Sequence, residues 1–340
     1  MSTTAPSPDL GIAVLETVLR VEDLVVSLPL GRGRTARAVN ELSFTLGKGE
    51  IFSIVGESGA GKSLAALSIL RLVPPQARLS GRIWFHGRNL LAVSPAELRT
   101  VRGNAISMIY QDPMTALNPV WTIGEQIGET VRLHERTGRR AAAERTLEVL
   151  ELARLAHPRR VAHSYPHQLS GGMLQRALIA LALCCRPEIL IADEPTTALD
   201  VTVQAQILKV LLGLRDELGL SIILITHDMG VVARTADRVL VMYAGRAVEL
   251  GGVLEVLPRP LHPYTGALSR SIDLTPARGR LAAIPGAPPP FGSLPAGCPF
   301  YPRCGYAQCR CAQGEPELRE FARRRGVRCH FPLDEHSADA

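Results

Sequence analysis

Eight consecutive residues have the types and spacing needed to hold a chain of phosphates: Gly56, Glu57, Ser58, Gly59, Ala60, Gly61, Lys62 and Ser63. The apolar run 51–55 before them is typical of a buried parallel strand, and the run 64–70 after them is typical of a helix. Glycines let backbone N–H groups turn toward a phosphate, and the helix N-terminus adds a positive dipole end. Lys62 is expected to reach the β- and γ-phosphates, and the Ser63 hydroxyl to ligate Mg²⁺. The sequence therefore predicts a nucleoside triphosphate site.

Polar side chains follow three other apolar runs of the expected sheet. Asp193 and Glu194 end one run, His227 follows a second and Gln111 follows a third. Because the carboxyl ends of parallel strands meet at one edge of a sheet, these side chains are expected beside the phosphates. Asp193 is placed to hold Mg²⁺ and Glu194 to polarise the attacking water. The alternatives are a solvated or helix-capping Glu194 and a purely structural His227.

A second phosphate-binding pattern lies further along the chain. Ser170, Gly171 and Gly172 open the apolar helical run 174–185, so exposed N–H groups and a positive dipole end are expected there. One chain rarely needs two such patterns for one ligand. The spacing therefore favours a nucleotide that is shared between two chains.

Composition limits the class of protein. The 340 residues are 46% apolar, which is enough for one large α/β domain and a smaller appendage. The net charge is +6, but only three of the 38 basic residues are lysines, and no basic stripe alternates with aromatics, so nucleic acid is not indicated as a partner. The longest apolar run, 177–185, is far shorter than the ~20 residues that span a bilayer, and the N-terminus lacks a secretory signal pattern. The chain is therefore expected to be made and kept in the cytosol.

The order of the apolar patterns predicts the fold. Runs at 24–28, 42–46 and 81–87 favour an antiparallel β layer beside the nucleotide strand. The continuous apolar runs 189–192 and 222–225 are typical of central strands in a parallel sheet covered on both faces.

Two further segments complete the organisation. Helical spacing over 122–156 predicts a small helical subdomain, placed at about 112–168. Beyond residue 272 the composition changes to a proline-rich connector, 284–290, and a cysteine-rich tail.

From residue 20 to 272 the chain resembles ABC transporter ATPases. The motifs that carry the resemblance occur in order at Gly56–Ser63, Gln111, Leu169–Met173, Asp193-Glu194, Ala198-Leu199-Asp200 and His227. The fold implied is an α/β P-loop NTPase core of the ABC type with an antiparallel β layer and a helical subdomain, followed here by the small cysteine-rich tail.

The resemblance implies a head-to-tail dimer closed over two molecules of ATP. Each ATP would lie between the phosphate loop of one chain and Ser170, Gly171, Gly172 and Asp200 of the other. In this class Glu194 would be the general base and His227 would contact the γ-phosphate. Gln111 would join Ser63 and Asp193 at Mg²⁺ and relay the state of the metal to the helical subdomain, which grips a membrane partner.

Two residues depart from the general pattern of these ATPases. Met173 stands where glutamine is common, although methionine is frequent in the peptide-importer branch. Leu28 stands where an aromatic residue that stacks on adenine is expected. The second departure leaves the base-stacking residue unassigned.

Three segments are similar to the dipeptide/oligopeptide (and nickel) importer branch: 111–119, 195–204 and His262-Pro263-Tyr264. The branch implies an ATP-hydrolysing subunit at the cytoplasmic face of the plasma membrane. Its partners would be a second ATPase subunit, identical or paralogous, two integral membrane permease subunits and an extracytoplasmic solute-binding protein. The alternative is a soluble ABC ATPase that acts on nucleic acid or ribosomes, against which these segments argue.

The same resemblance divides the chain into three parts. They are an N-terminal extension, 1–19, an ABC ATPase domain, 20–255, and a C-terminal region of the oligopeptide-importer type, 256–340.

Five of the seven cysteines lie in the last 43 residues: Cys298, Cys304, Cys309, Cys311 and Cys329. Disulfides are disfavoured in a reducing cytosol, and zinc is the alternative ligand, although structural zinc sites usually pair cysteines two to four residues apart. The spacing is similar to that of the importer branch, in which Cys298, Cys304, Cys311 and Cys329 would hold a [4Fe–4S] cluster, with Cys309 as the alternative to Cys311. Because the cluster lies outside every nucleotide motif, hydrolysis is expected to survive its loss.

Overall fold

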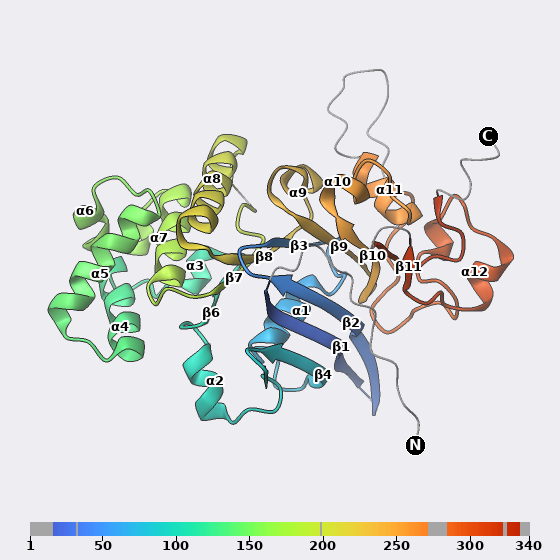
Figure 1. Ribbon diagram of the computed structural model, residues 1–340, viewed down its shortest axis with the longest axis horizontal. Helices are drawn as coiled ribbons and strands as arrows, with labels where there is room; N and C mark the ends of the chain where they lie inside the picture. The colour runs from blue at the N-terminus through green and yellow to red at the C-terminus, as the bar shows by residue number, and fades with distance from the viewer. Residues whose placement is uncertain (1–15, 32, 198, 271–283, 322–324, 334–340) are drawn as a thin grey trace.

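The computed structural model describes residues 16–31, 33–197, 199–270, 284–321 and 325–333 (Figure 1). Most of the expected N-terminal extension lies outside these residues, as does Ala198 of the Ala198-Leu199-Asp200 motif. The described part of the chain forms two sheets, with helices at both ends of the long axis.

The larger sheet contains the strand that leads into the phosphate loop. Within the described residues it has eight strands, in the order β11-β12-β10-β9-β3-β8-β7-β6. Their bounds are β3 (Ile51–Val55), β6 (Ile106–Ile109), β7 (Ile189–Asp193), β8 (Ser221–Thr226), β9 (Arg238–Tyr243), β10 (Arg246–Gly252), β11 (Arg319–Phe321) and β12 (Arg325–Val327). The strands from β9 to β6 are parallel neighbours, and every residue of β3, β7 and β8 is buried. Burial on both faces explains the continuous apolar runs, and the predicted parallel sheet is confirmed.

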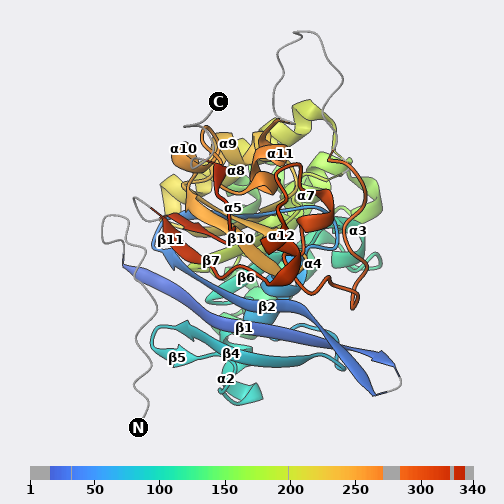
Figure 2. The ribbon, with the colours of Figure 1, turned by 90° about the vertical axis from the view of Figure 1, so that its right-hand side faces the viewer.

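The smaller sheet is antiparallel and has the order β2-β1-β4-β5. Its strands are β1 (Thr17–Gly31), β2 (Arg34–Gly47), β4 (Arg78–Phe85) and β5 (Arg88–Asn89). Figure 2 shows this sheet below the larger one. Phe44 of β2 and Phe52 of β3 stack with ring centroids 5.0 Å apart, so an aromatic pair joins the two sheets. The predicted antiparallel layer is confirmed.

Polar caps fix where three of the helices begin. α1 (Lys62–Ile69), α8 (Val201–Leu218) and α9 (Met229–Thr235) come after β3, β7 and β8, whose carboxyl ends form the nucleotide edge, and α7 (Gly171–Leu183) comes after the helical subdomain. The side chains of Ser170, Asp200 and Asp228 each accept an N–H from the first turn of the helix that follows. These three residues therefore hold the starts of α7, α8 and α9 in place.

The helical subdomain occupies one end of the molecule (Figure 1). It contains α3 (Pro113–Ala116), α4 (Ile123–Glu135), α5 (Arg139–Leu152) and α6 (Pro158–Ala162). A capping box of Thr122 and Glu125 starts α4. Ile127 and Val131 of α4 are buried in the same core as Leu150 of α5, as the spacing predicts. The short helix α2 (Pro95–Val101) lies outside this subdomain.

The C-terminal region packs at the opposite end (Figure 1). Its helices are α10 (Val253–Val256), α11 (Pro263–Ser269) and α12 (Cys309–Gln313), with a 3-10 turn at Tyr301–Arg303. β12 pairs with β10, and Arg325 forms a buried ion pair with Glu249, so the tail extends the sheet of the core. The division of the chain at residue 255 stays a prediction. Across the described residues, no helix is long and apolar enough to cross a membrane.

Candidate functional site

The phosphate loop needs glycine at two positions because other backbone comes close. Gly56 directly follows β3 with a φ of 153°, and a Cβ there would overlap the carbonyl oxygen of Met242. Gly61 caps α1 with a φ of 97°, and its Cβ would lie 2.6 Å from the carbonyl oxygen of Ala38. A side chain at either position would displace the loop.

Lys62 lies inside this loop. Its Nζ donates to the carbonyl oxygens of Gly56 at 2.8 Å and of Glu57 at 3.0 Å. Burial lowers the pKa of the Lys62 ammonium, and the carboxylates of Glu194 and Asp193 oppose this shift. A buried ammonium surrounded by loop backbone is suited to bind phosphate oxygens.

The two predicted Mg²⁺ ligands lie beside each other. The Ser63 hydroxyl, on α1, donates to Oδ1 of Asp193, at the end of β7, at 3.1 Å. Burial raises the pKa of Asp193, and the hydrogen bond from Ser63 opposes this shift. A hydroxyl and a carboxylate at this distance offer the oxygen donors that Mg²⁺ prefers.

Three polar groups surround the carboxylate of Glu194. Gln111 Nε2 donates to Glu194 Oε2 at 3.1 Å, and the Thr197 hydroxyl donates to the same oxygen at 2.9 Å. His227 Nδ1 lies 3.4 Å from Glu194 Oε1. The backbone of Glu194 has a φ of 47°, a left-handed conformation that is costly outside glycine and is common at functional sites. The predicted residues Glu194, Gln111 and His227 therefore come together, as strand-end positions indicate.

Thr197 is a site residue that the sequence analysis did not single out. It lies three residues after Glu194, a spacing at which a hydroxyl can reach back across a turn, and Thr197 N also donates to the Glu194 carbonyl at 3.1 Å. That local turn spacing is the signal that could have identified it.

The second phosphate-binding pattern lies outside the nucleotide cavity of its own chain. Ser170 caps α7 and Asp200 caps α8, and a Cβ at Gly172 would lie 2.7 Å from Cγ1 of Val203. Among the described residues, Ser170, Gly171, Gly172 and Asp200 do not line the cavity at the phosphate loop.

That cavity has a volume of about 820 Å³. It is lined by residues 58–64 of the loop and its helix, by Gln111 and Glu194, and by Leu28 of β1. The proline-rich run 284–290 also lines it, through Pro288 and Pro289, and so do the residues after it, through Phe291, Gly292 and Leu294. We call the whole segment 284–298 the connector. No sequence motif placed it at the nucleotide.

The C-terminal region forms hydrogen bonds with the phosphate loop at Glu57. Arg303 donates from both terminal nitrogens to the Glu57 carboxylate, at 2.6 and 2.9 Å, and also to the Tyr243 hydroxyl at 3.2 Å. The backbone N–H of Glu57 donates to the Tyr264 hydroxyl at 2.8 Å. Residues far apart in sequence therefore meet at Glu57, and the tail contacts the phosphate loop. Survival of hydrolysis without the cluster stays a prediction.

Four tail cysteines line one small cavity: Cys298, Cys304, Cys311 and Cys329. Burial raises the pKa of the Cys298 thiol to about 11 and that of Cys329 to about 12. Cys309 is exposed and is not in the lining. Among the residues that the structure describes, no group of three or more His, Cys, Asp or Glu side chains is arranged to hold a metal ion.

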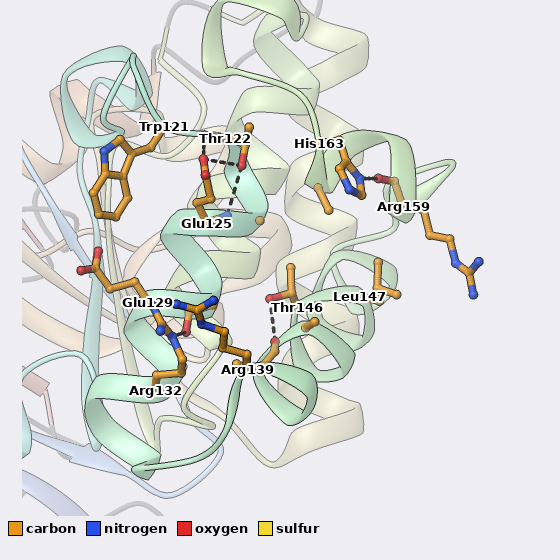
Figure 3. Close-up of a pocket in the computed structure, with 15 residues that line it drawn as sticks. Trp121, Thr122, Glu125, Glu129, Arg132, Arg139, Thr146, Leu147, Arg159 and His163 are labelled. Atoms are coloured by element: carbon orange, nitrogen blue, oxygen red, sulfur yellow. Dashed lines mark hydrogen bonds between the residues drawn. The ribbon is translucent and has the colours of Figure 1, made fainter.

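A second large cavity, also of about 820 Å³, lies in the helical subdomain. Its lining comes from the segment before α4, from α4 itself, and from α5 and α6 (Figure 3). Charged side chains of both signs border it, including Glu129, Arg132, Arg139 and Arg159. We call this cavity the subdomain groove.

A phosphate loop, the Ser63 hydroxyl and Asp193 carboxylate beside it, and the Glu194 carboxylate directly after β7 define a P-loop ATPase. Residues 39–197 match the ABC transporter family, and residues 248–311 match the family described as "Oligopeptide/dipeptide transporter, C-terminal region". The chain belongs to the ATP-binding proteins of ABC transporters, in the branch that carries this C-terminal region.

Several relatives are similar over nearly the whole chain. A probable peptide ABC transporter ATP-binding protein of Sinorhizobium fredii is 50% identical over 90% of this chain and 92% of its own length. The oligopeptide transport ATP-binding protein OppD of Salmonella typhimurium is 45% identical, covering 98% of both. The dipeptide transport ATP-binding protein DppD of Bacillus subtilis is 48% identical over 89% of this chain and 91% of its own.

Solved structures agree with the fold. A dimer of the ATP-binding cassette MJ0796 bound to ADP and Pi has a TM-score of 0.62 and 28% identity, over 69% of this chain and 98% of that one. The protein cbiO1 of Clostridium perfringens, part of an ABC transporter complex, has a TM-score of 0.60 and 27% identity, over 76% and 96%. The predicted ABC-type fold is thus confirmed.

Proposed function

We propose that this chain hydrolyses ATP to drive the import of peptides or a related solute through a membrane permease. The observation that carries the proposal is the C-terminal region at 248–311, which the described peptide transporters share and which is joined here to a complete ATPase core. The alternative, an ABC ATPase that acts on nucleic acid or ribosomes, has no comparable support.

The decisive experiment is purification of the tagged chain from gently solubilised membranes. We expect two integral membrane subunits to co-purify, and an added extracytoplasmic binding protein with its peptide to stimulate hydrolysis. Recovery of ribosomal RNA or DNA in place of membrane subunits would overturn the proposal. Membrane subunits would also support a position at the cytoplasmic face of the plasma membrane.

In the proposed reaction each residue has a defined role. Lys62 binds the β- and γ-phosphates, and Ser63, Asp193 and Gln111 would hold Mg²⁺, which would neutralise charge on the phosphates. Glu194 accepts a proton from the water that attacks the γ-phosphorus. Thr197 and Gln111 orient this carboxylate through their hydrogen bonds, and His227 lies beside it to contact the γ-phosphate.

The second phosphate-binding pattern acts across a dimer. Ser170, Gly171, Gly172 and Asp200 do not line the cavity of their own chain, which leaves them to complete the site of a partner. The partner is a second ATPase subunit, either a copy of this chain or a paralogue. If the chain pairs with itself, mixing Lys62→Ala with Ser170→Arg chains puts both defects in one shared site and leaves the other intact. We expect hydrolysis to recover on mixing; no recovery in a demonstrated mixed dimer would contradict sites shared in this way.

The subdomain groove is the proposed binding site for a cytoplasmic segment of the permease. Gln126 of α4 accepts from Asn118 N–H at 2.9 Å and donates to the Trp121 carbonyl at 3.1 Å. These bonds connect α4 with the segment that follows Gln111. Movement at the groove is thereby linked to the residue that touches Glu194.

Filling the groove tests this assignment. A Cβ at Gly128, in the groove lining, has only Thr146 Oγ1 at 3.7 Å near it, so the position has room for a Cβ and Gly128→Leu adds bulk at the groove. Gly213→Leu, on α8 with only Glu217 Oε1 at 3.9 Å, is the matched control. We expect only Gly128→Leu to lose permease binding while both variants bind ATP; normal binding by Gly128→Leu would contradict the assignment.

The tail cysteines are the proposed ligands of a [4Fe–4S] cluster. The support is that Cys298, Cys304, Cys311 and Cys329 converge on one cavity and that thiolates are the usual ligands of iron–sulfur clusters. When bound, the cluster would cross-link four segments of a small region that has little apolar surface of its own.

Anaerobic purification tests the cluster. We expect iron and acid-labile sulfide in the wild type, their loss when any of the four cysteines is replaced by serine, and their retention in Cys309→Ser. Stoichiometric zinc in colourless protein would replace the cluster with a zinc site.

A further inference from the structure

The proline-rich connector forms part of the nucleotide cavity, although it contains no ATPase motif. Pro288, Pro289, Phe291, Gly292 and Leu294 line the same cavity as the phosphate loop and Leu28. Phe291 and Leu294 are 48% and 42% exposed, so both present apolar surface at this cavity. The connector therefore adds apolar surface, including an aromatic ring, to that supplied by Leu28 and the core.

A tight turn presents Phe291. Ser293 N–H donates to the Pro290 carbonyl at 3.0 Å, which closes a four-residue turn with Phe291 in the second position. Gly292, in the third position, has a φ of 81°, the conformation that glycine adopts there readily. A Cβ at Gly292 would lie 2.5 Å from Cδ1 of Leu30, so this glycine lets the turn approach β1 two residues beyond Leu28.

Both ends of the connector are hydrogen-bonded to the C-terminal region, which also contacts the phosphate loop. Arg303, which holds Glu57, also donates from Nε to the Pro285 carbonyl at 2.9 Å. At the other end Cys298 N–H donates to the Cys311 carbonyl at 2.8 Å. The same side chain thus positions the phosphate loop and the start of the connector.

With leucine at position 28, the residue that stacks on the nucleobase is unassigned. The resemblance to ABC transporter ATPases implies an aromatic residue near the end of this strand that stacks on the nucleobase, and Leu28 has no π face with which to do so. Phe291 brings an aromatic ring to the same cavity from a segment that packs against the same strand.

We propose that Phe291 stacks on the nucleobase of the bound nucleotide and supplies the aromatic face that Leu28 lacks. The phenyl ring carries no hydrogen-bonding group, and stacking on an aromatic ring accepts any base. The contact therefore strengthens binding of purine nucleotides without distinguishing adenine from guanine.

The test is equilibrium binding to the full-length chain of Mg²⁺ complexes of ATP, GTP and inorganic tripolyphosphate, the last of which has no base. Phe291→Ala is expected to weaken ATP and GTP alike by about 5- to 100-fold, from the usual cost of losing one base stack. Tripolyphosphate binding should not change, and Phe291→Trp should retain ATP affinity. Leu254→Ala, at a residue 88% exposed on α10, is the control for losing an exposed apolar side chain.

Unchanged or tighter ATP binding by Phe291→Ala would overturn the proposal. An equal loss for tripolyphosphate would also overturn it, because the connector would then act on the phosphate loop and not on the base. Phe291 is half exposed, so its replacement is not expected to unfold the chain, which thermal unfolding verifies. Failure of the wild type itself to bind ATP would instead contradict the ATPase function.

Discussion

The C-terminal region and the helical subdomain lie at opposite ends of the long axis, yet each reaches the nucleotide site (Figure 1). The C-terminal region holds the phosphate loop with the Arg303–Glu57 ion pair, whose arginine is 5% exposed, and with the Tyr264 hydroxyl. The helical subdomain follows Gln111, an exposed residue with one hydrogen bond to Glu194.

The two contacts differ in rigidity, so we expect one region to affect ATP binding and the other to affect hydrolysis. A bidentate ion pair with a buried arginine fixes geometry, whereas one exposed hydrogen bond is readily broken and remade. We infer that the phosphate loop is preorganised, while the orientation of the Glu194 carboxylate responds to movement of the helical subdomain. Variants on the two sides should therefore change different kinetic constants.

The largest expected effect is that of Glu194→Gln. Glu194 lies in the nucleotide cavity with the phosphate loop and accepts the hydrogen bond of Gln111. The amide keeps the shape of the side chain but cannot accept the proton of the attacking water. We expect kcat for ATP to fall by ~10²–10⁴-fold with ATP affinity retained, measured by steady-state hydrolysis and nucleotide binding. Near-normal turnover would remove Glu194 from the role of general base.

Arg303→Ala should act on binding. Glu57 would lose both charged hydrogen bonds and leave an unbalanced negative charge beside the incoming phosphates. From the usual cost of losing hydrogen bonds to charged groups, we expect KM for ATP to rise by about 10- to 100-fold. The change in kcat should be smaller. The exposed Arg310→Ala is the control.

Removing the unpaired negative charge of Glu57 provides a second test. Glu57→Gln combined with Arg303→Ala should recover part of the lost affinity. If Arg303→Ala leaves KM unchanged, the C-terminal region does not position the phosphate loop, and the comparison between the two ends fails.

The smallest expected effects come from the two hydrogen bonds to Glu194 Oε2. Gln111→Ala and Thr197→Val each remove one bond, and each should lower basal kcat by about 2- to 10-fold. Only Gln111 leads into the helical subdomain, so only Gln111→Ala should also lose stimulation by the permease. Equal loss of stimulation in both variants would show that Gln111 has no special part in the coupling.

Much of the site could be predicted because its parts are local. The phosphate loop is a strand, a turn and a helix within about twenty residues, and strand-end positions bring Asp193, Glu194 and His227 to one edge of a parallel sheet. Thr197 was missed although its contact is equally local, because its only signal is a spacing of three residues from Glu194, which belongs to none of the motifs considered.

The sequence by itself determined the nucleotide chemistry, the parallel sheet and the family, since these follow from short motifs and from apolar periodicity. Only the tertiary structure decided that Arg303 meets Glu57 across 246 residues of chain, that β12 extends the core sheet beside β10 and that the connector lines the nucleotide cavity. These contacts join irregular segments, whose positions depend on how the whole tail packs and not on any repeating pattern. A single buried arginine can form such a contact without leaving a signal in the residues around it.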